Sequence, residues 1–131
     1  MVSKFLKLTS FFIFPFAIFC LALFFYFSGI YALFPWLDVP LHFLGGISIA
    51  YLGILLLRNF SGYIQIKDEI AKIIVVVSFV CLFAILWELW EFIAGNFLGM
   101  SFFVQESLED TLFDLFLGLC GGLVGGIFSK I

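Results

Sequence analysis

This sequence contains few charged residues. Only 11% of its 131 residues are charged, 65% are hydrophobic, and histidine occurs once. Such a composition leaves too little polar surface to enclose the core of a water-soluble protein. Together with a mean hydropathy of +1.29, it predicts an integral membrane protein. Nucleic acid is excluded as a partner, because its binding requires a basic stripe and the net charge here is −3.

Cysteine and proline are also scarce, with three residues of each. No two cysteines have Cys-x-x-Cys spacing, so Cys20, Cys81 and Cys120 are expected to act as small apolar residues and not as disulfide, metal or redox groups. Among the prolines, Pro15 is expected to bend the first helix, because proline removes one backbone donor.

What the sequence has instead is four long apolar runs. A helix needs about 17–25 apolar residues to cross a hydrocarbon core of about 30 Å. The expected spans are residues 9–33, 40–57, 73–94 and 111–128, and residues 58–72 form a polar cytoplasmic loop. The pattern predicts an all-α fold, a polytopic four-transmembrane-helix bundle that occupies residues 1–131 as a single domain. The first run exceeds the roughly 7–15 residues of a signal-peptide core, so it is expected to stay as an anchor.

The basic residues predict the orientation of the bundle. An even number of spans places both termini on one side, where six basic residues also fall: Lys4, Lys7, Arg58, Lys67, Lys72 and Lys130. The positive-inside rule makes this side cytoplasmic, which predicts a multi-pass protein of the cell (inner or plasma) membrane. Trp36, Trp87 and Trp90 fall near the opposite boundary, as expected of an interfacial aromatic belt.

Polar residues gather in pairs near the outer ends of the last three expected helices. The pairs are Asp38 with His42, Glu88 with Glu91, and Asp110 with Asp114. Each pair is spaced three or four residues apart, which places both members on one helical face. Small residues continue each face along its helix, and small faces pack against other membrane helices. The pairs are therefore expected to point into the bundle at a shared depth.

Some of these residues also have structural explanations. Asp38 precedes Pro40 and is suited to cap the second helix. Asp110 and Asp114 each follow a hydroxyl residue by three positions, which is the pattern of a helix-capping box. Glu109 is expected to be a solvated surface charge.

Glu88 and Glu91 are harder to explain as structural residues. Both lie near the expected C-terminal end of the third helix, where the helix dipole disfavours negative charge. Ionisable residues within a span usually face the bundle interior and mark a functional path. A lone histidine is more often structural than a ligand, and His42 is left open between the two roles.

Carboxylates crowded in a poorly solvated site cannot all stay ionised, and the outer side has no Lys or Arg to neutralise them. Either protons or a bound cation must compensate. One imidazole with several oxygen ligands suits a divalent metal, Mg²⁺, Mn²⁺, Fe²⁺ or Zn²⁺. The predicted metal ligands are His42, Glu88, Glu91 and Asp114, with Asp38 and Asp110 as supporting or capping residues. Glu88, Glu91 and Asp114 are also the candidate catalytic carboxylates.

These motifs cover residues 36–126 and resemble those of a known family. They are Asp38-x-x-x-His42-Phe43 followed by Gly45-Gly46, then Glu88-x-x-Glu91, then Asp110-x-x-x-Asp114-x-x-x-Gly118. The arrangement resembles the YjdF-like family of small bacterial inner-membrane proteins and, more distantly, the VanZ-like family associated with glycopeptide-antibiotic tolerance. Glu91 and Asp114 stand where amides are usual in the VanZ-like proteins. The resemblance implies one constellation of polar residues and names no substrate.

Three functions follow as hypotheses. The first is an outward-facing cation site, in which a metal-dependent enzyme acts on a lipid headgroup or envelope precursor. The second is a proton or cation transporter, although no ionisable chain continues from the cluster toward Arg58. The third is a structural or assembly protein without catalysis. In that case a helix-mediated oligomer is expected to form through Gly118, Gly122 and Gly126.

Overall fold

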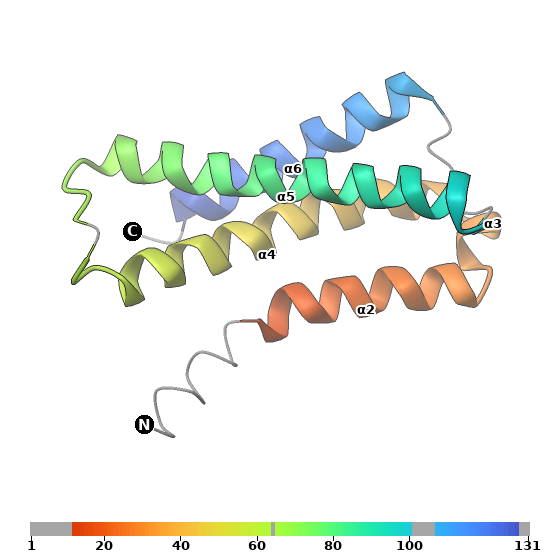
Figure 1. Cartoon of the computed structure of the whole chain (residues 1–131), viewed down its shortest axis with the longest axis horizontal. Helices are drawn as coiled ribbons and strands as arrows, with labels where there is room; N and C mark the ends of the chain where they lie inside the picture. Colours follow the sequence, from red (N-terminus) through yellow and green to blue (C-terminus); the bar gives the residue numbers. More distant parts are fainter. Residues whose placement is uncertain (1–11, 64, 101–106, 129–131) are drawn as a thin grey trace.

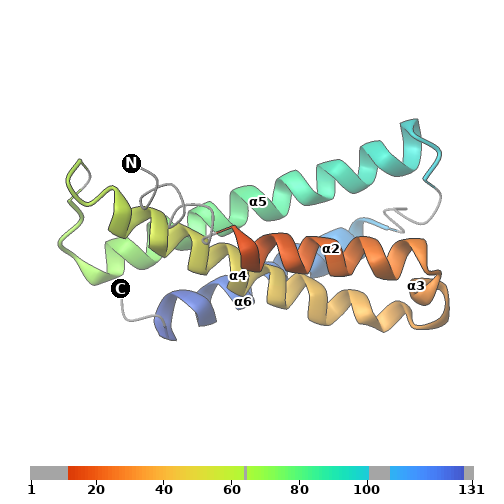
Figure 2. The ribbon, with the colours of Figure 1, turned by 90° about the horizontal axis from the view of Figure 1, so that it is seen from below.

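The computed structural model describes residues 12–63, 65–100 and 107–128, and these residues contain helices and no strands. The helices are α2 (Ile13–Phe27), α3 (Ile30–Leu33), the 3-10 helix η1 (Pro35–Leu37), α4 (Asp38–Asn59), α5 (Glu69–Phe97) and α6 (Leu108–Phe128). Helices α4, α5 and α6 pack together, while α2 lies alongside α4 on the outside of this group (Figures 1 and 2).

Among the residues that the structure describes, three helical segments are long and apolar enough to cross a membrane: Pro35–Asn59, Glu69–Phe97 and Leu108–Phe128. Helix α2 is apolar but has 15 residues, fewer than the roughly 20 that a spanning helix needs. The described part of this membrane protein is therefore all-helical, with three candidate spans and one shorter apolar helix. Lys4, Lys7 and Lys130, on which the predicted orientation partly depends, lie outside the described residues.

The first apolar run is not one helix in the structure. Helix α2 ends at Phe27, and Gly29 follows with a φ of +72° before the chain continues as α3. A positive φ is easy for glycine, which lacks a Cβ atom, and it commonly ends a helix just after its last turn. One span over residues 9–33 was predicted from apolar composition, which does not reveal this break.

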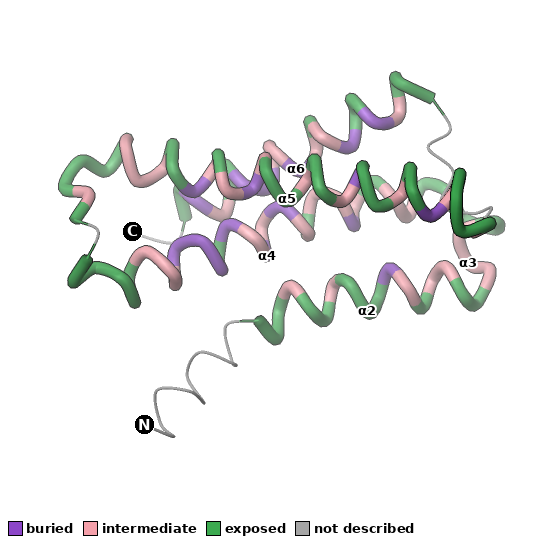
Figure 3. The backbone as a smooth tube through the Cα atoms, viewed as in Figure 1, coloured by how far each residue is buried: buried purple, intermediate pink, exposed green. Residues whose placement is uncertain are grey.

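Helices α4 and α6 approach so closely that their backbones touch. A Cβ atom added at Gly46 of α4 would overlap the carbonyl of Gly118, and one added at Gly121 of α6 would overlap the carbonyl of Phe43. Small residues permit such contacts between membrane helices. In Figure 3 the buried positions of α4 and α6 accordingly lie along the contact between them.

Three glycines of α6 were predicted to mediate an oligomer, and the structure gives them another role. Gly118, Gly122 and Gly126 are all buried, and their nearest neighbours include Ala84, Val80 and Val76 of α5. The glycine face predicted to mediate an oligomer is therefore occupied within the chain, because α6 packs between α4 and α5. The core beside it is formed by Ala50, Ile54, Val76 and Val80.

Candidate functional site

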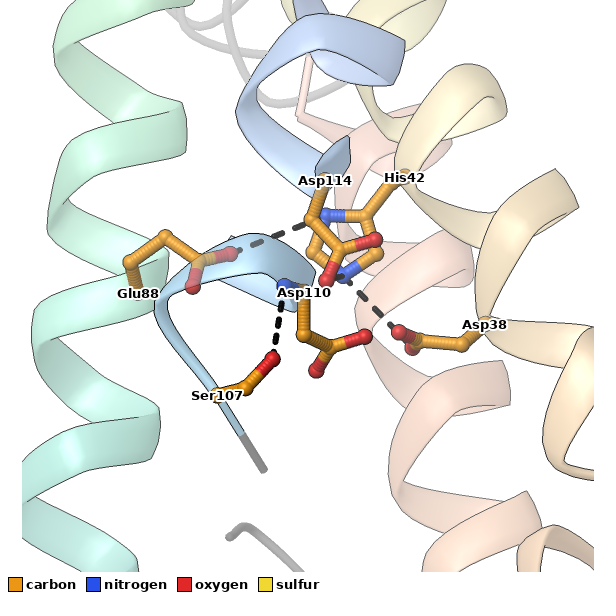
Figure 4. A network of polar contacts seen from close by, with 6 residues as sticks. All are labelled: Asp38, His42, Glu88, Ser107, Asp110 and Asp114. Atoms are coloured by element: carbon orange, nitrogen blue, oxygen red, sulfur yellow. Dashed lines mark hydrogen bonds and ion pairs between the residues drawn. The ribbon is translucent and has the colours of Figure 1, made fainter. Parts of the chain in front are cut away.

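Helices α4, α5 and α6 bring the predicted polar residues together around His42 (Figure 4). The imidazole Nε2 lies 3.5 Å from Asp38 Oδ1 and 3.9 Å from Asp114 Oδ2. The other ring nitrogen, Nδ1, lies 4.0 Å from Glu88 Oε1. Ligand atoms of His42, Glu88 and Glu91 all lie within 4.8 Å of one another, as do those of Asp38, His42 and Asp114. These five residues are called the His42 cluster below.

The glycine contact between α4 and α6 explains why Asp114 reaches His42. Gly46 lies one helical turn after His42, and Gly118 lies one turn after Asp114, so each pair shares a helical face. Because Gly46 meets the Gly118 carbonyl directly, the two backbones are close at this level. The neighbouring turn therefore holds the imidazole and the carboxylate close together as well.

Glu88 and Glu91 enter the cluster from α5, but not from its end. The helix continues to Phe97, so both carboxylates are more than one turn inside it, and the helix dipole acts mainly within the last turn. The expectation that the dipole makes them unfavourable was therefore wrong. Their removal from water is the main electrostatic penalty instead, since charged groups lose hydration when they are buried.

Burial is strongest at Glu88 and Asp114, which are 7% and 3% exposed. The Thr111 side chain is a hydrogen-bond partner of the Glu88 carboxylate, yet Glu88 Oε1 is buried with no hydrogen-bond partner among the described residues. A buried polar atom left without a partner costs about 1–3 kcal/mol, and more when it is charged. Glu88 Oε1 is therefore a site at which a positive ligand would be strongly stabilised.

Asp38 interacts with the cluster and does not cap a helix. The residue before α4 is Leu37, and no side-chain hydrogen bond caps this end. The Asp38 carboxylate lies 3.5 Å from His42 Nε2 and is also a hydrogen-bond partner of the Tyr31 side chain. Tyr31 was missed by the sequence analysis, because it falls inside an apolar run and belongs to none of the paired positions.

At the start of α6, Ser107 is the capping residue and Asp110 is the residue whose amide it caps. Its amide donates a hydrogen bond of 3.1 Å to Ser107 Oγ. Figure 4 shows its side chain on the same side of the cluster as Asp38 and Asp114. Glu109, on the same turn, is exposed, whereas Glu106 lies outside the described residues.

The described cationic side chains of α4 and α5 are remote from the cluster. Arg58 follows His42 by 16 residues and Lys72 precedes Glu88 by 16 residues, which corresponds to about 24 Å along each helix. Lys72 forms its ion pair with Glu69. The carboxylates of the cluster therefore share a single imidazole as their nearest basic group on these helices.

A hard or borderline metal ion would be the natural partner for this donor set. Carboxylate oxygens and an imidazole nitrogen suit Mg²⁺, Mn²⁺, Fe²⁺ or Zn²⁺, and thiolates, which soft metals prefer, are absent from the cluster. Such an arrangement can bind a cation, orient a ligand oxygen on it, or move protons between carboxylates.

Comparison with curated proteins and with solved structures finds no match. One family model does match, and it covers residues 2–131. Its description, predicted membrane protein, agrees with the apolar helices of the fold. The chain therefore belongs to the DUF2238 family of predicted membrane proteins.

Proposed function

We propose that this membrane protein binds a divalent cation at His42, Glu88, Glu91 and Asp114 and uses it to act on a lipid headgroup or envelope precursor. The observation that carries the proposal is the Glu88 carboxylate. Its side chain is 8% exposed, and its Oε1 atom has no hydrogen-bond partner among the described residues while lying 4.0 Å from His42 Nδ1. A cation between these two atoms would satisfy both.

The contacts of the imidazole favour one side of the ring for the cation. A neutral imidazole has one N–H donor and one nitrogen that accepts or ligates. The closest carboxylate, Asp38, faces Nε2, so a proton on Nε2 is stabilised there and Nδ1 is left with its lone pair. Glu88 lies on the Nδ1 side, and Glu91 belongs to the same group of possible ligands as Glu88. A metal ligand that donates its other ring N–H to a carboxylate is a recurrent arrangement in metalloproteins.

Asp114 is proposed to help balance the positive charge of the bound cation from the Nε2 side of the imidazole. Its carboxylate is 5% exposed and lies 3.9 Å from Nε2. A bound metal supplies Lewis acidity to a phosphoryl or carbonyl oxygen. A carboxylate beside it that does not ligate the metal can act as general base. With Glu88 as a ligand on the Nδ1 side, Asp114 is the candidate that fits this role best.

We further propose a four-span topology with both termini cytoplasmic, in which the first apolar run, which contains α2, supplies the first span. Basic residues at both ends and at the α4–α5 connection support it. The cluster would then face outward, consistent with an envelope substrate.

Metal analysis of purified protein tests the proposal. The wild type, incubated with Mg²⁺, Mn²⁺, Fe²⁺ or Zn²⁺ and then desalted, should retain about one metal ion per chain, since the ligands form one centre around a single imidazole. His42→Ala and Glu88→Ala should lose it, whereas Glu109→Ala, which changes an exposed carboxylate of α6, should retain it. Equal metal content in all four proteins would disprove the proposal.

Asp38→Asn should weaken metal binding without abolishing it. The amide still accepts a hydrogen bond from Nε2–H but carries no charge, so the imidazole becomes a poorer ligand. Loss of a supporting partner of this kind typically lowers metal affinity about 10–100-fold. A Mn²⁺ titration of the purified variant measures the change, and an affinity equal to that of the wild type would remove Asp38 from the site.

A further inference from the structure

A cavity of about 370 Å³ lies beside the His42 cluster, among α2, α4 and α5. Most of its lining is apolar, with phenylalanines of α2 on one side and residues of α4 and α5 on the other. Polar groups concentrate at one end, where Tyr31, Asp38 and His42 line it. Ser48 also lines it, but its hydroxyl donates a hydrogen bond of 2.8 Å to the Gly45 carbonyl. The lining therefore complements a molecule with a long apolar body and one polar end.

The length of the cavity fits one leaflet of a bilayer. Along α4 its lining runs from Asp38 to Ile49, which is eleven residues or about 16 Å of helix. Half of a hydrocarbon core of about 30 Å is about 15 Å. The volume falls near the lower limit of the roughly 300–1,000 Å³ that small-molecule sites occupy, which favours a single hydrocarbon chain over a whole two-chain lipid.

We propose that this cavity holds one hydrocarbon chain of a phosphate-bearing lipid, whose phosphate reaches the His42 cluster. The position of the chain depends only on the cavity, but the phosphate contact rests on the proposed function. Arg58 and Lys72 are too distant to bind a phosphate here, and the carboxylates would repel one. A divalent cation held by the carboxylates would turn this repulsion into attraction, because such a cation commonly completes its coordination with substrate phosphate oxygens.

Gly45 provides a direct way to fill the cavity. It lines the space, and a Cβ atom added there would meet no atom within 4 Å. Gly45→Phe should therefore direct its ring into the cavity, since its Cβ atom lies in open space. Gly45→Ala is the matched control, since it makes the same change to the backbone and leaves most of the space open.

Photolabelling in vesicles tests the proposal. The probe is phosphatidic acid with a diazirine in one acyl chain, present at low level in phosphatidylcholine vesicles with Mn²⁺. We expect labelled residues on the cavity faces of α2 and α4. Gly45→Phe should lower this labelling about tenfold, because its ring takes the space of the chain and crowding of this kind costs about 1–3 kcal/mol. Gly45→Ala should be labelled like the wild type.

Competition by unlabelled lipids distinguishes binding of the acyl chain from binding of the phosphate head group. Unlabelled phosphatidic acid should compete with the probe, diacylglycerol should compete poorly, and chelation of Mn²⁺ should remove the difference. Unchanged labelling in Gly45→Phe would overturn the proposal for the cavity. Equal competition by both lipids in a protein that has bound its Mn²⁺ would overturn the phosphate contact alone. A Gly45→Phe effect in a protein that binds no metal would confirm the chain site and reject the phosphate contact together with the proposed function.

Discussion

The Glu88→Gln variant should have the same stability with and without Mn²⁺, whereas the wild type should be stabilised by Mn²⁺. A ligand that binds only the folded state at about 100 times its Kd adds about 2.7 kcal/mol to the free energy of unfolding. Glutamine keeps the shape of Glu88 and its contact with Thr111, but it removes the charge that Oε1 presents to the cluster. Unfolding in mixed detergent micelles, followed by the helical circular dichroism signal, measures both proteins.

Without metal, the Glu88→Gln variant should not be less stable than the wild type. Burying a carboxylate without a full set of partners is costly, and Glu88 is 7% exposed. The neutral glutamine should therefore leave metal-free protein at least as stable as the wild type. Glu109→Gln, an exposed position on α6, should behave like the wild type under both conditions. If Mn²⁺ stabilised Glu88→Gln as much as the wild type, Glu88 could not be a ligand.

Helical spacing was enough to predict most of the cluster. His42 follows Asp38 by four residues, and their side chains are 3.5 Å apart at the closest pair of atoms. The shared depth of His42, Glu88 and Asp114 was estimated from distances along their helices, and the structure places both carboxylates within 4.0 Å of the imidazole. Such estimates succeed because a membrane helix has a nearly fixed rise and its polar residues avoid lipid.

The contribution of Tyr31 could not be predicted in the same way. It reaches Asp38 from α3, a short helix whose position depends on the turn at Gly29. Hydropathy placed this segment inside one long span, and a tyrosine in an apolar run has no periodicity to distinguish it. The fold of the first apolar run was predicted least well for this reason, because a single positive φ angle changed the direction of the chain.

Adjacent glycines show a second limit of the sequence. Gly45 and Gly46 are neighbours and both line the cavity, yet a Cβ atom at Gly46 would overlap the Gly118 carbonyl whereas one at Gly45 would meet open space. The difference is one helical position, about 100° around the axis. The rotation of α4 about its own axis decides which glycine packs against α6. This rotation cannot be predicted from the amino-acid composition.

Gly46→Ala should therefore destabilise the protein, and Gly45→Ala should not. The Cβ atom at residue 46 would overlap the Gly118 carbonyl, which is backbone and cannot turn away, so α4 and α6 must separate. Overpacking of this kind costs about 1–3 kcal/mol, occasionally more. Alanine at residue 45 meets open space and gains up to about 1 kcal/mol of helix propensity. Unfolding in mixed micelles should place the two variants on opposite sides of the wild type.

The same pair of variants tests whether the glycine contact positions the site. Separation of α4 from α6 at Gly46 also moves Asp114 away from His42, since each lies one turn from the contact. Gly46→Ala should then lower the affinity for Mn²⁺ even in the fraction that remains folded, and Gly45→Ala should preserve it. A Gly46→Ala protein that is less stable but binds Mn²⁺ like the wild type would show that the contact supports the fold without positioning Asp114. A joint loss would mean that one backbone contact determines both the packing of the bundle and the geometry of its cation site.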